Sequence, residues 1–526
     1  MFAAKLKRLS AGLCLLLILS LPVNATRANG RHNALTPDAG RALDTLPPGA
    51  MMRVIVHLDE RAELEARPGA RQTARVITAL HEHAETAQIL LRDWLRLRET
   101  GGKARDITPF WVFNGLAVTA SRDVILALAA RPDVARVALD EAFLAPPQFS
   151  PTSNTDVRAA VGLRRGALTQ TTAGAEGTVG ENLNLIGAPE AWARGITGKG
   201  VVVAVLDSGA DLSHPDLKTR WRGGSNSWFD PYGEFPEAPA DLGGHGTQVL
   251  GVILGGDAGG SPIGVAPDAQ WIAAKIFDTR GRATISSIHL ALQWVLDPDG
   301  DPATDDAPHI VNSSWASVIG LCNLEFADDL RALRAAGILP IFAAGVDGQT
   351  SPANTPEAFA VGALAGAETL SSDSPPGPSA CADKPVFPQV VAPSGSVRTT
   401  DLFGTYVTLE GGTSIAAAHV SGALALLLSA NPALTVEEQE TLLAETAVDL
   451  GEPGPDDKFG YGRINVAAAL DRLLGPDPAA HAIAVALATP PTSPNPSVPP
   501  IALIGALVVL LIGLGVVWRR RSKRSP

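Results

Sequence analysis

Continuous apolar runs alternate with helical stretches through the central and C-terminal parts of the chain. The runs are short and contain few polar positions, as expected for parallel strands that are buried on both faces. They lie at residues 201–206, 271–276, 309–312 and 338–343. Between two of these runs, Ile285, Ile288 and Leu292 recur at helical spacing. The alternation predicts an α/β domain that is built on a doubly wound parallel sheet.

A separate pattern precedes this domain, over residues 50–144. The predicted elements are a strand at 54–58, a helix at 71–97, two strands within 111–118, a helix at 124–130 and a strand at 134–139. The two middle strands are divided at Asn114-Gly115, a dipeptide typical of tight turns. Strand, helix, two strands, helix and strand is the order of the split βαβ motif. We therefore expect a small α+β, ferredoxin-like domain ahead of the α/β domain.

Residues 145–180 join the two regions and are rich in Pro, Thr, Ser, Gly and Gln. This composition predicts an exposed linker. Exposed linkers are the sites where proteolytic cleavage concentrates. Arg164-Arg165 is one candidate processing site within it.

Residues 1–25 have the order of a signal peptide. Three basic residues, Lys5, Lys7 and Arg8, precede an apolar run at 11–23 that closes on the small residue Ala25. An N-terminal membrane anchor is the alternative, but the run is short for a span. The pattern therefore predicts an exported protein.

The C-terminal end carries a second apolar segment, at residues 501–518. As a helix it would be roughly 27 Å long, close to the thickness of a bilayer core. The basic residues of the tail, 519–526, follow it, and the positive-inside rule places such a tail in the cytoplasm. A Pro-rich linker at 476–500 would act as a semi-rigid spacer. A transmembrane anchor and a sorting signal that is processed at the cell envelope are both compatible with this tail, and a buried core helix is the less favoured alternative.

The charge of the chain bears on whether it binds nucleic acid, and its cysteines bear on the compartment in which it folds. The chain has 42 basic and 54 acidic residues and a net charge of -12, which argues against a nucleic-acid-binding protein. Of its 3 cysteines, Cys14 lies in the predicted signal peptide. Cys322 and Cys381 remain, and they would form one disulfide in an export compartment or stay as two unpaired thiols.

Three residues in the α/β region have the chemistry of a serine hydrolase. Asp207 ends the first predicted strand, His245 lies between glycines in GGHGT, and Ser414 opens a small-residue helix that Asn431-Pro432 ends. Each alone has an ordinary explanation, as a sheet-edge Asp, a loop or metal-ligand His and an N-cap Ser. Together they supply a nucleophile, a base and a carboxylate that orients the base. Their order, Asp then His then Ser, is that of subtilisin.

The sequence around these residues resembles the subtilase family. The blocks VLDSGADLSHPDL, GGHGTQVLGVI and GGTSIAAAHVSG resemble the three signature blocks of subtilases, in the same order. The resemblance covers about residues 183–474, and RWRGGSNSWFD is similar to bacillopeptidase F-like members in particular. It implies a peptidase domain at 181–475 with serine endopeptidase activity on protein or peptide substrates.

The resemblance extends to the small domain. The stretches NGLAVTAS and PDVARVALDE are similar to the inhibitory propeptide of subtilases. This similarity implies that residues 50–144 act as an intramolecular inhibitor in a self-processing precursor. An unrelated ferredoxin-like module is the alternative.

The resemblance also implies which residues bind the substrate. An extended peptide would pair with the backbone of an exposed strand. The positions implied are Ser314, Trp315 and Ala316 on one side of the cleft, and Ala343, Ala344 and Gly345 on the other. Core packing is an equal alternative for Trp315.

Two positions depart from the family pattern. The oxyanion hole would combine the Ser414 backbone amide with an Asn side chain, but the Asn position holds Val346, which cannot donate a hydrogen bond. A pseudoprotease that binds peptides without turnover is therefore the alternative function. Ala418 replaces the usual Pro before His419, and we expect only a slight effect on the helix start.

An acidic cluster follows the predicted helix that contains Leu292. Its members are Asp297, Asp299, Asp301, Asp305 and Asp306. Calcium prefers several oxygen ligands, so calcium is a conceivable stabilising ion. The segment lacks the full calcium-loop signature and its closing Glu, which favours a solvated acidic loop. We expect no required cofactor and no assigned metal site.

Overall fold

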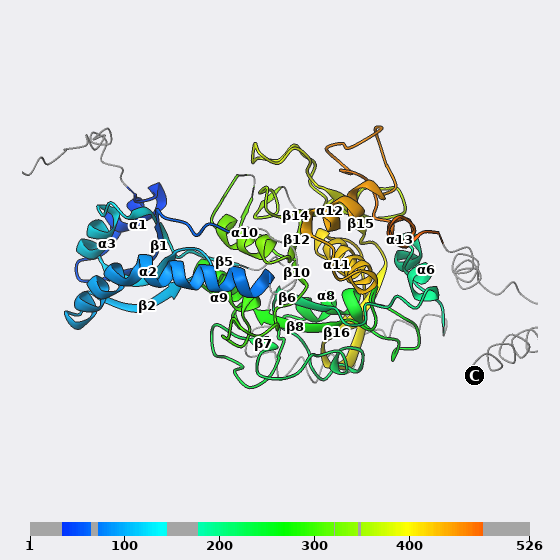
Figure 1. Ribbon diagram of the computed structural model, residues 1–526, viewed down its shortest axis with the longest axis horizontal. Helices are drawn as coiled ribbons and strands as arrows, with labels where there is room; N and C mark the ends of the chain where they lie inside the picture. Colours follow the sequence, from blue (N-terminus) through cyan, green and yellow to red (C-terminus); the bar gives the residue numbers. More distant parts are fainter. Residues whose placement is uncertain (1–33, 65–71, 145–176, 320, 346–348, 477–526) are drawn as a thin grey trace, which may run out of the picture.

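A computed structural model describes residues 34–64, 72–144, 177–319, 321–345 and 349–476. The predicted signal peptide, most of the 145–180 linker, Arg164-Arg165 and the C-terminal segment 501–518 lie outside the described residues. In Figure 1 the elements of residues 34–144 lie at one end of the long axis, beside a larger α/β unit. We call these parts the N-terminal unit and the α/β unit.

The N-terminal unit is a four-stranded antiparallel sheet with helices. Its elements are α1 (Pro37–Thr45), β1 (Met51–Leu58), α2 (Gln72–Thr100), β2 (Ala104–Phe110), β3 (Gly115–Ser121), α3 (Arg122–Ala129) and β4 (Val134–Leu139). The strand order is β2-β3-β1-β4. This topology agrees with the expected split βαβ order, and the short helix α1 was not predicted.

The prediction of two strands within 111–118 is wrong in its first half. The strand that pairs with β3 is β2, which ends at Phe110. Trp111, Val112 and Phe113 form the turn between β2 and β3. β2 is largely exposed and polar, so it lacks an apolar pattern. The apolar turn residues Val112 and Phe113 are instead buried in the core shared with the α/β unit.

The α/β unit is built on a seven-stranded sheet in which all neighbouring strands are parallel. Its strand order is β15 (Val390–Pro393), β14 (Phe359–Leu364), β12 (Leu339–Ala343), β10 (Ile310–Ser313), β6 (Val202–Asp207), β8 (Gln270–Lys275) and β7 (Trp228–Phe229). Four of these strands match the four apolar runs to within one residue at each end. The prediction of a doubly wound parallel α/β sheet is confirmed.

Helices cover both faces of this sheet. They are α5 (Glu181–Leu185), α6 (Ala188–Ala193), α7 (Pro215–Lys218), α8 (His245–Leu254), α9 (Ile285–Leu296), α10 (Ala327–Ala335), α11 (Thr413–Ala430), α12 (Val436–Glu445) and α13 (Val466–Leu474), with a 3₁₀ turn at Leu402–Gly404. Alternate residues of β6 enter different cores, because successive strand side chains point to opposite faces. Val203 and Val205 pack with α8 and α11, whereas Ala204 packs with α9 and α10.

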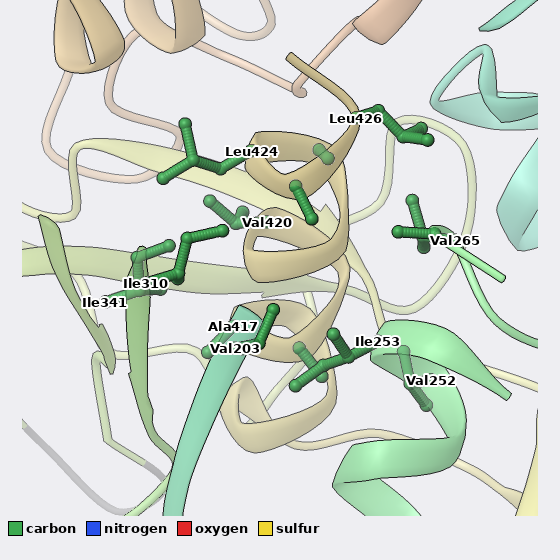
Figure 2. Close-up of a cluster of buried hydrophobic side chains, with 14 of the residues drawn as sticks. Val203, Val252, Ile253, Val265, Ile310, Ile341, Ala417, Val420, Leu424 and Leu426 are labelled. Carbon is green, nitrogen blue, oxygen red and sulfur yellow. The ribbon is translucent and has the colours of Figure 1, made fainter. Parts of the chain in front are cut away.

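Helix α11 is the centre of one of these cores. Figure 2 shows its residues Ala417, Val420 and Leu424 surrounded by side chains of the sheet and of α8. Among the described residues it is the one helix long and apolar enough to cross a membrane, and 89% of that stretch is buried. Because it is enclosed by protein, α11 is a core helix.

Three two-stranded sheets and one disulfide complete the described fold. The pairs are β5 (Ala142–Leu144) with β9 (Arg282–Thr284), β11 (Val318–Ile319) with β13 (Thr350–Ser351), and β16 (Val397–Asp401) with β17 (Thr405–Leu409). The β5–β9 pair joins the end of the N-terminal unit to the α/β unit. Cys322 and Cys381 form a disulfide, which decides between the two alternatives left by the sequence.

A buried cluster of charged and polar groups lies between the two units. The carboxylate of Glu325, which is 4% exposed, lies 2.8 Å from His57 Nε2 and pairs with Arg136 Nη1 at 2.6 Å. Both partners belong to the N-terminal unit. Within the α/β unit, His289 Nε2 lies 3.2 Å from the same carboxylate and its Nδ1 lies 2.8 Å from Asp329. The cluster therefore links the two units through one carboxylate.

Candidate active site

Asp207 and His245 form a direct hydrogen bond. Asp207 is the last residue of β6 and is fully buried. His245 is the first residue of α8, and its Nδ1 lies 2.9 and 3.0 Å from the two carboxylate oxygens of Asp207. A carboxylate only accepts hydrogen bonds, so Nδ1 carries the proton in this contact. In the neutral ring, Nε2 is then the basic nitrogen.

Two glycines allow the chain segments to approach this pair closely. Gly209 has a φ of 125°, and a Cβ there would lie 1.9 Å from the carbonyl oxygen of Ala240. A Cβ at Gly246 would lie 2.1 Å from the carbonyl oxygen of Gly209 and 3.2 Å from Asp207 Cβ. A larger side chain at either position would therefore displace the backbone that carries Asp207 and His245.

Asp241 fixes the turn from which His245 projects. Its carboxylate accepts from the amides of Gly243 and Gly244 at 2.9 and 2.8 Å, and from the amide and hydroxyl of Thr247 at 3.0 and 2.7 Å. It also accepts from Ser208 Oγ at 3.0 Å. Ser208 follows Asp207 directly, so these bonds tie the end of β6 to the start of α8.

Ser414 lies at the N-terminal end of α11, which packs against α8. Its side chain is buried, and its Oγ donates to the carbonyl of Ser314 at 3.2 Å. Ser314 Oγ donates in return to the carbonyl of Ser414 at 3.0 Å. Asn312 Nδ2 donates to Ser314 Oγ at 3.1 Å, and Asn312 Oδ1 accepts from Ser421 Oγ at 2.8 Å. The start of α11 is thus held against the segment that follows β10.

Thr413 holds the same helix end against the segment that follows β12. Its hydroxyl donates to the carbonyl of Gly345 and accepts from the Gly345 amide, the latter at 3.2 Å. The first amides of a helix have no partner within the helix and favour negative charge nearby. Val346 is the next residue after Gly345 and lies outside the described residues, so its predicted place in an oxyanion hole stays a prediction.

The predicted substrate-binding residues lie in two segments, after β10 and around the end of β12. The first segment contains Ser314, Trp315 and Ala316, and the second contains Ala343, Ala344 and Gly345. The indole of Trp315 is packed edge-on against Phe326 and Phe342, with ring centroids 5.9 and 5.4 Å apart, and the residue is 2% exposed. Its side chain therefore belongs to the core, which was the alternative interpretation of this residue.

His419, in the third sequence block, has a buried and satisfied ring. Its Nδ1 donates to the carbonyl of Ile415 at 2.8 Å, and its Nε2 accepts from Asn182 Nδ2 at 2.9 Å. A carbonyl only accepts and this amide nitrogen only donates, so the ring is neutral. Burial lowers the pKa of His419 to about 4. These contacts give it a structural role in α11.

Two groups of the described residues have the spacing of metal ligands. One consists of His57, His289 and Glu325, and the other of Asp297, Asp299 and Asp306. Neither group contains Asp207, His245 or Ser414.

Sequence reasoning did not single out Asp241, Asn312 or Thr413. Each is buried and uses its side chain to position a neighbouring loop or helix end. The spacing in DLGGHGT, with an Asp four residues before His245, was a usable signal. Asn312 and Thr413 carry no comparable local signal, because Ser421 and Gly345, which they contact, are distant in sequence.

Comparison with known proteins gives one consistent family. The model of the "Subtilase family" matches residues 198–462. Bacillopeptidase F of Bacillus subtilis (strain 168) is 34% identical over 433 residues, covering 77% of this chain and 29% of that protein. Subtilisin BL of Lederbergia lenta is 36% identical over 290 residues, covering 55% of this chain and 97% of that protein. Subtilisin E of Bacillus subtilis (strain 168) is 34% identical over 297 residues, covering 55% of this chain and 70% of that protein.

Proposed function

The chain belongs to the subtilase family, and from this premise we propose that it is a serine endopeptidase in which Asp207, His245 and Ser414 form the catalytic triad. The observation that carries the proposal is the hydrogen bond from His245 Nδ1 to Asp207. It fixes the tautomer in which Nε2 can accept the proton of a serine hydroxyl. Ser414 lies at the N-terminal end of α11, and α11 packs against α8, the helix that begins at His245.

The proposed reaction begins when Ser414 Oγ attacks the carbonyl carbon of the scissile peptide bond. The proton of Oγ passes to His245 Nε2, and the same nitrogen later returns it to the leaving amine. Since Oγ now donates to Ser314, the hydroxyl must first turn from that carbonyl toward His245. Asp207 keeps its charge and stabilises the imidazolium that forms.

The negative charge of the tetrahedral intermediate would be stabilised by the backbone amide of Ser414. This amide lies in the first turn of α11, where the helix dipole also favours negative charge. Val346 supplies no side-chain donor. The loss of the corresponding Asn donor from subtilisin lowers kcat by about 10² to 10³. We therefore expect a working enzyme with a weakened oxyanion hole.

The N-terminal unit would act as the inhibitory propeptide of this enzyme. It buries apolar side chains of β1, α2 and the turn after β2 against α9 and α10. Strand β5, at its end, pairs with β9 of the α/β unit and leads into the linker. This arrangement supports a precursor that is cleaved after folding, within residues 145–180.

The terminal segments support an exported enzyme with its catalytic unit outside the cytoplasm. The signal-peptide pattern of residues 1–25 would direct export. The apolar segment 501–518 and its basic tail would anchor the protein in the membrane or serve as a sorting signal. Mass analysis of the mature C-terminus separates the two: an intact tail means an anchor, and a truncated tail means processing.

The test is a casein digestion by the purified full-length chain beside three variants. These are Ser414→Ala, Val346→Asn and the combination of both. The proposal predicts activity in the parent, a rise of about 10² in Val346→Asn, and no activity in either variant that lacks Ser414. Peptide binding without turnover, the alternative that rests on Val346, predicts an inactive parent. Activity that survives Ser414→Ala would show that the nucleophile is wrong.

A further inference from the structure

A buried asparagine lies on β10, the middle strand of the seven-stranded sheet. Asn312 is fully buried, and its neighbour across the sheet is Val205 of β6, two residues before Asp207. A buried amide costs free energy unless its donors and acceptors are satisfied, so such a side chain on a central strand calls for a specific role. Asn312 has its place at the carboxyl end of the sheet, where α/β proteins bind their ligands.

The side chain of Asn312 connects β10 to helix α11. Its Oδ1 accepts from Ser421 Oγ at 2.8 Å, and its Nδ2 donates to Ser314 Oγ at 3.1 Å. Ser314 Oγ donates its single proton to the carbonyl of Ser414 at 3.0 Å, so it accepts from the amide. Each member donates to the next, and the bonds therefore run in one direction from Ser421 to the Ser414 carbonyl.

The network attaches α11 at two points on one face. Ser414 and Ser421 are seven residues apart, which is close to two helical turns, so they lie on the same side of the helix. All members of the network are buried. Hydrogen bonds that share partners in a buried, low-dielectric setting strengthen one another. An attachment in the first turn and a second one two turns later resists both sliding and tilting of α11.

The same helix approaches α8 closely at Gly422. A Cβ at this position would lie 2.9 Å from the carbonyl oxygen of Ile253, so a larger residue would push the two helices apart. Ile253 belongs to α8, the helix that begins at His245. The position of α11 between β10 and α8 therefore determines where Ser414 lies relative to His245.

We propose that Asn312 and Ser421 are positioning residues for the nucleophile, and that they act through Ser314. This inference rests on the proposed function of Ser414. Its hydroxyl must leave the Ser314 carbonyl, the present acceptor at 3.2 Å, before it can reach the base. The network holds the backbone of the nucleophile in place while the hydroxyl turns. Reacting atoms must come within about 3 to 3.5 Å, and a misplacement of about 1 Å can cost 10²-fold in rate.

The test compares Ser421→Ala with Ser429→Ala in the purified full-length chain. Both substitutions remove one hydroxyl from α11 and introduce the best helix former. Ser429 Oγ donates to the carbonyl of Leu426 at 2.9 Å within the helix, so it is a matched control outside the network. Hydrolysis of a chromogenic peptide that the parent cleaves gives kcat and KM. The value of kcat is expressed per site that a fluorophosphonate labels at completion, so that unfolded or unprocessed protein does not count.

Ser421→Ala should lower kcat about tenfold and change KM by less than twofold. The reason is that the position of the nucleophile changes, whereas the segments that bind the peptide do not. Ser429→Ala should match the parent in both constants. Asn312→Asp, which cannot donate to Ser314 Oγ, should lower kcat at least as far as Ser421→Ala. Equal kcat in Ser421→Ala and Ser429→Ala would overturn the role of Ser421, and an unchanged kcat in Asn312→Asp would overturn that of Asn312.

A double-mutant cycle with Ser314→Ala tests the path of the effect. If Ser421 acts through the Ser314 hydroxyl, its loss should have little further effect once that hydroxyl is absent. The double variant should therefore have the kcat of Ser314→Ala to within about twofold, and a further tenfold loss would overturn the path. An inactive parent would refute the proposed function itself, whereas an active parent with an unaffected Ser421→Ala would refute this inference alone.

Discussion

Glu325→Gln should loosen the N-terminal unit from the α/β unit. The substitution keeps the size of the side chain but removes the negative charge that His57 and Arg136 share. Breaking a buried ion pair by removing one partner costs about 3 to 5 kcal/mol. Arg136 is 34% exposed and can be partly rehydrated, which favours the lower value. About 3 kcal/mol corresponds to a roughly hundredfold weaker docking equilibrium.

Hydrogen exchange can measure this effect at one amide between the units. The backbone N–H of Trp111 donates to Gln293 Oε1 on α9 at 2.7 Å, so it is protected only while the units are docked. In the full-length chain with Ser414→Ala, Glu325→Gln should raise the exchange rate of a peptide that contains Trp111 by roughly a hundredfold.

Glu440→Gln is the matched control for this measurement. Glu440 forms a two-oxygen ion pair with Arg334, but both residues belong to the α/β unit. Its substitution should leave the exchange at Trp111 unchanged. The reasoning is refuted if Glu325→Gln and Glu440→Gln give the same exchange rate as the parent.

Two further predictions concern stability and pH. Burial opposes the charged form of His289, but Asp329 and Glu325 raise its pKa to about 9, well above the ordinary histidine value. The contribution of His289 to the free energy of unfolding is therefore complete below about pH 6.5 and is lost as the pH rises through 9. Urea unfolding should show a loss of about 3 kcal/mol between pH 7 and pH 10 that His289→Gln does not show, and an equal loss in both proteins would contradict it. The pKa of His419 is lowered to about 4, so its contribution is complete above about pH 6.5 and is lost as the pH falls toward 4. His419→Gln should flatten the stability profile between pH 6.5 and 4, and an unchanged slope would contradict the assignment.

The parallel sheet could be predicted because its strands are buried on both faces. Such strands have continuous apolar sequences, and Val203 and Ala204 show why, since neighbouring residues enter different cores. Strand β2 escaped the same reasoning because it is mostly exposed and polar. The apolar turn at Trp111 to Phe113 was misread as strand, because its burial depends on contact with the α/β unit.

Some residues of the candidate site could also be predicted from local sequence, and others could not. Asp207, His245 and Ser414 lie in recognisable local motifs, and their order along the chain indicated the family. The cluster around Glu325 could not be found, because its members are distant in sequence and each alone resembles an ordinary surface residue.

The most direct test of the central claim is covalent labelling of the purified full-length chain with a fluorophosphonate, followed by mass spectrometry of its peptides. A triad predicts a single modified residue, Ser414, because only an activated serine reacts at a useful rate. It also predicts that His245→Ala abolishes the modification, since the base is then absent. Labelling of another serine, or of Ser414 to the same extent in His245→Ala, would contradict the claim.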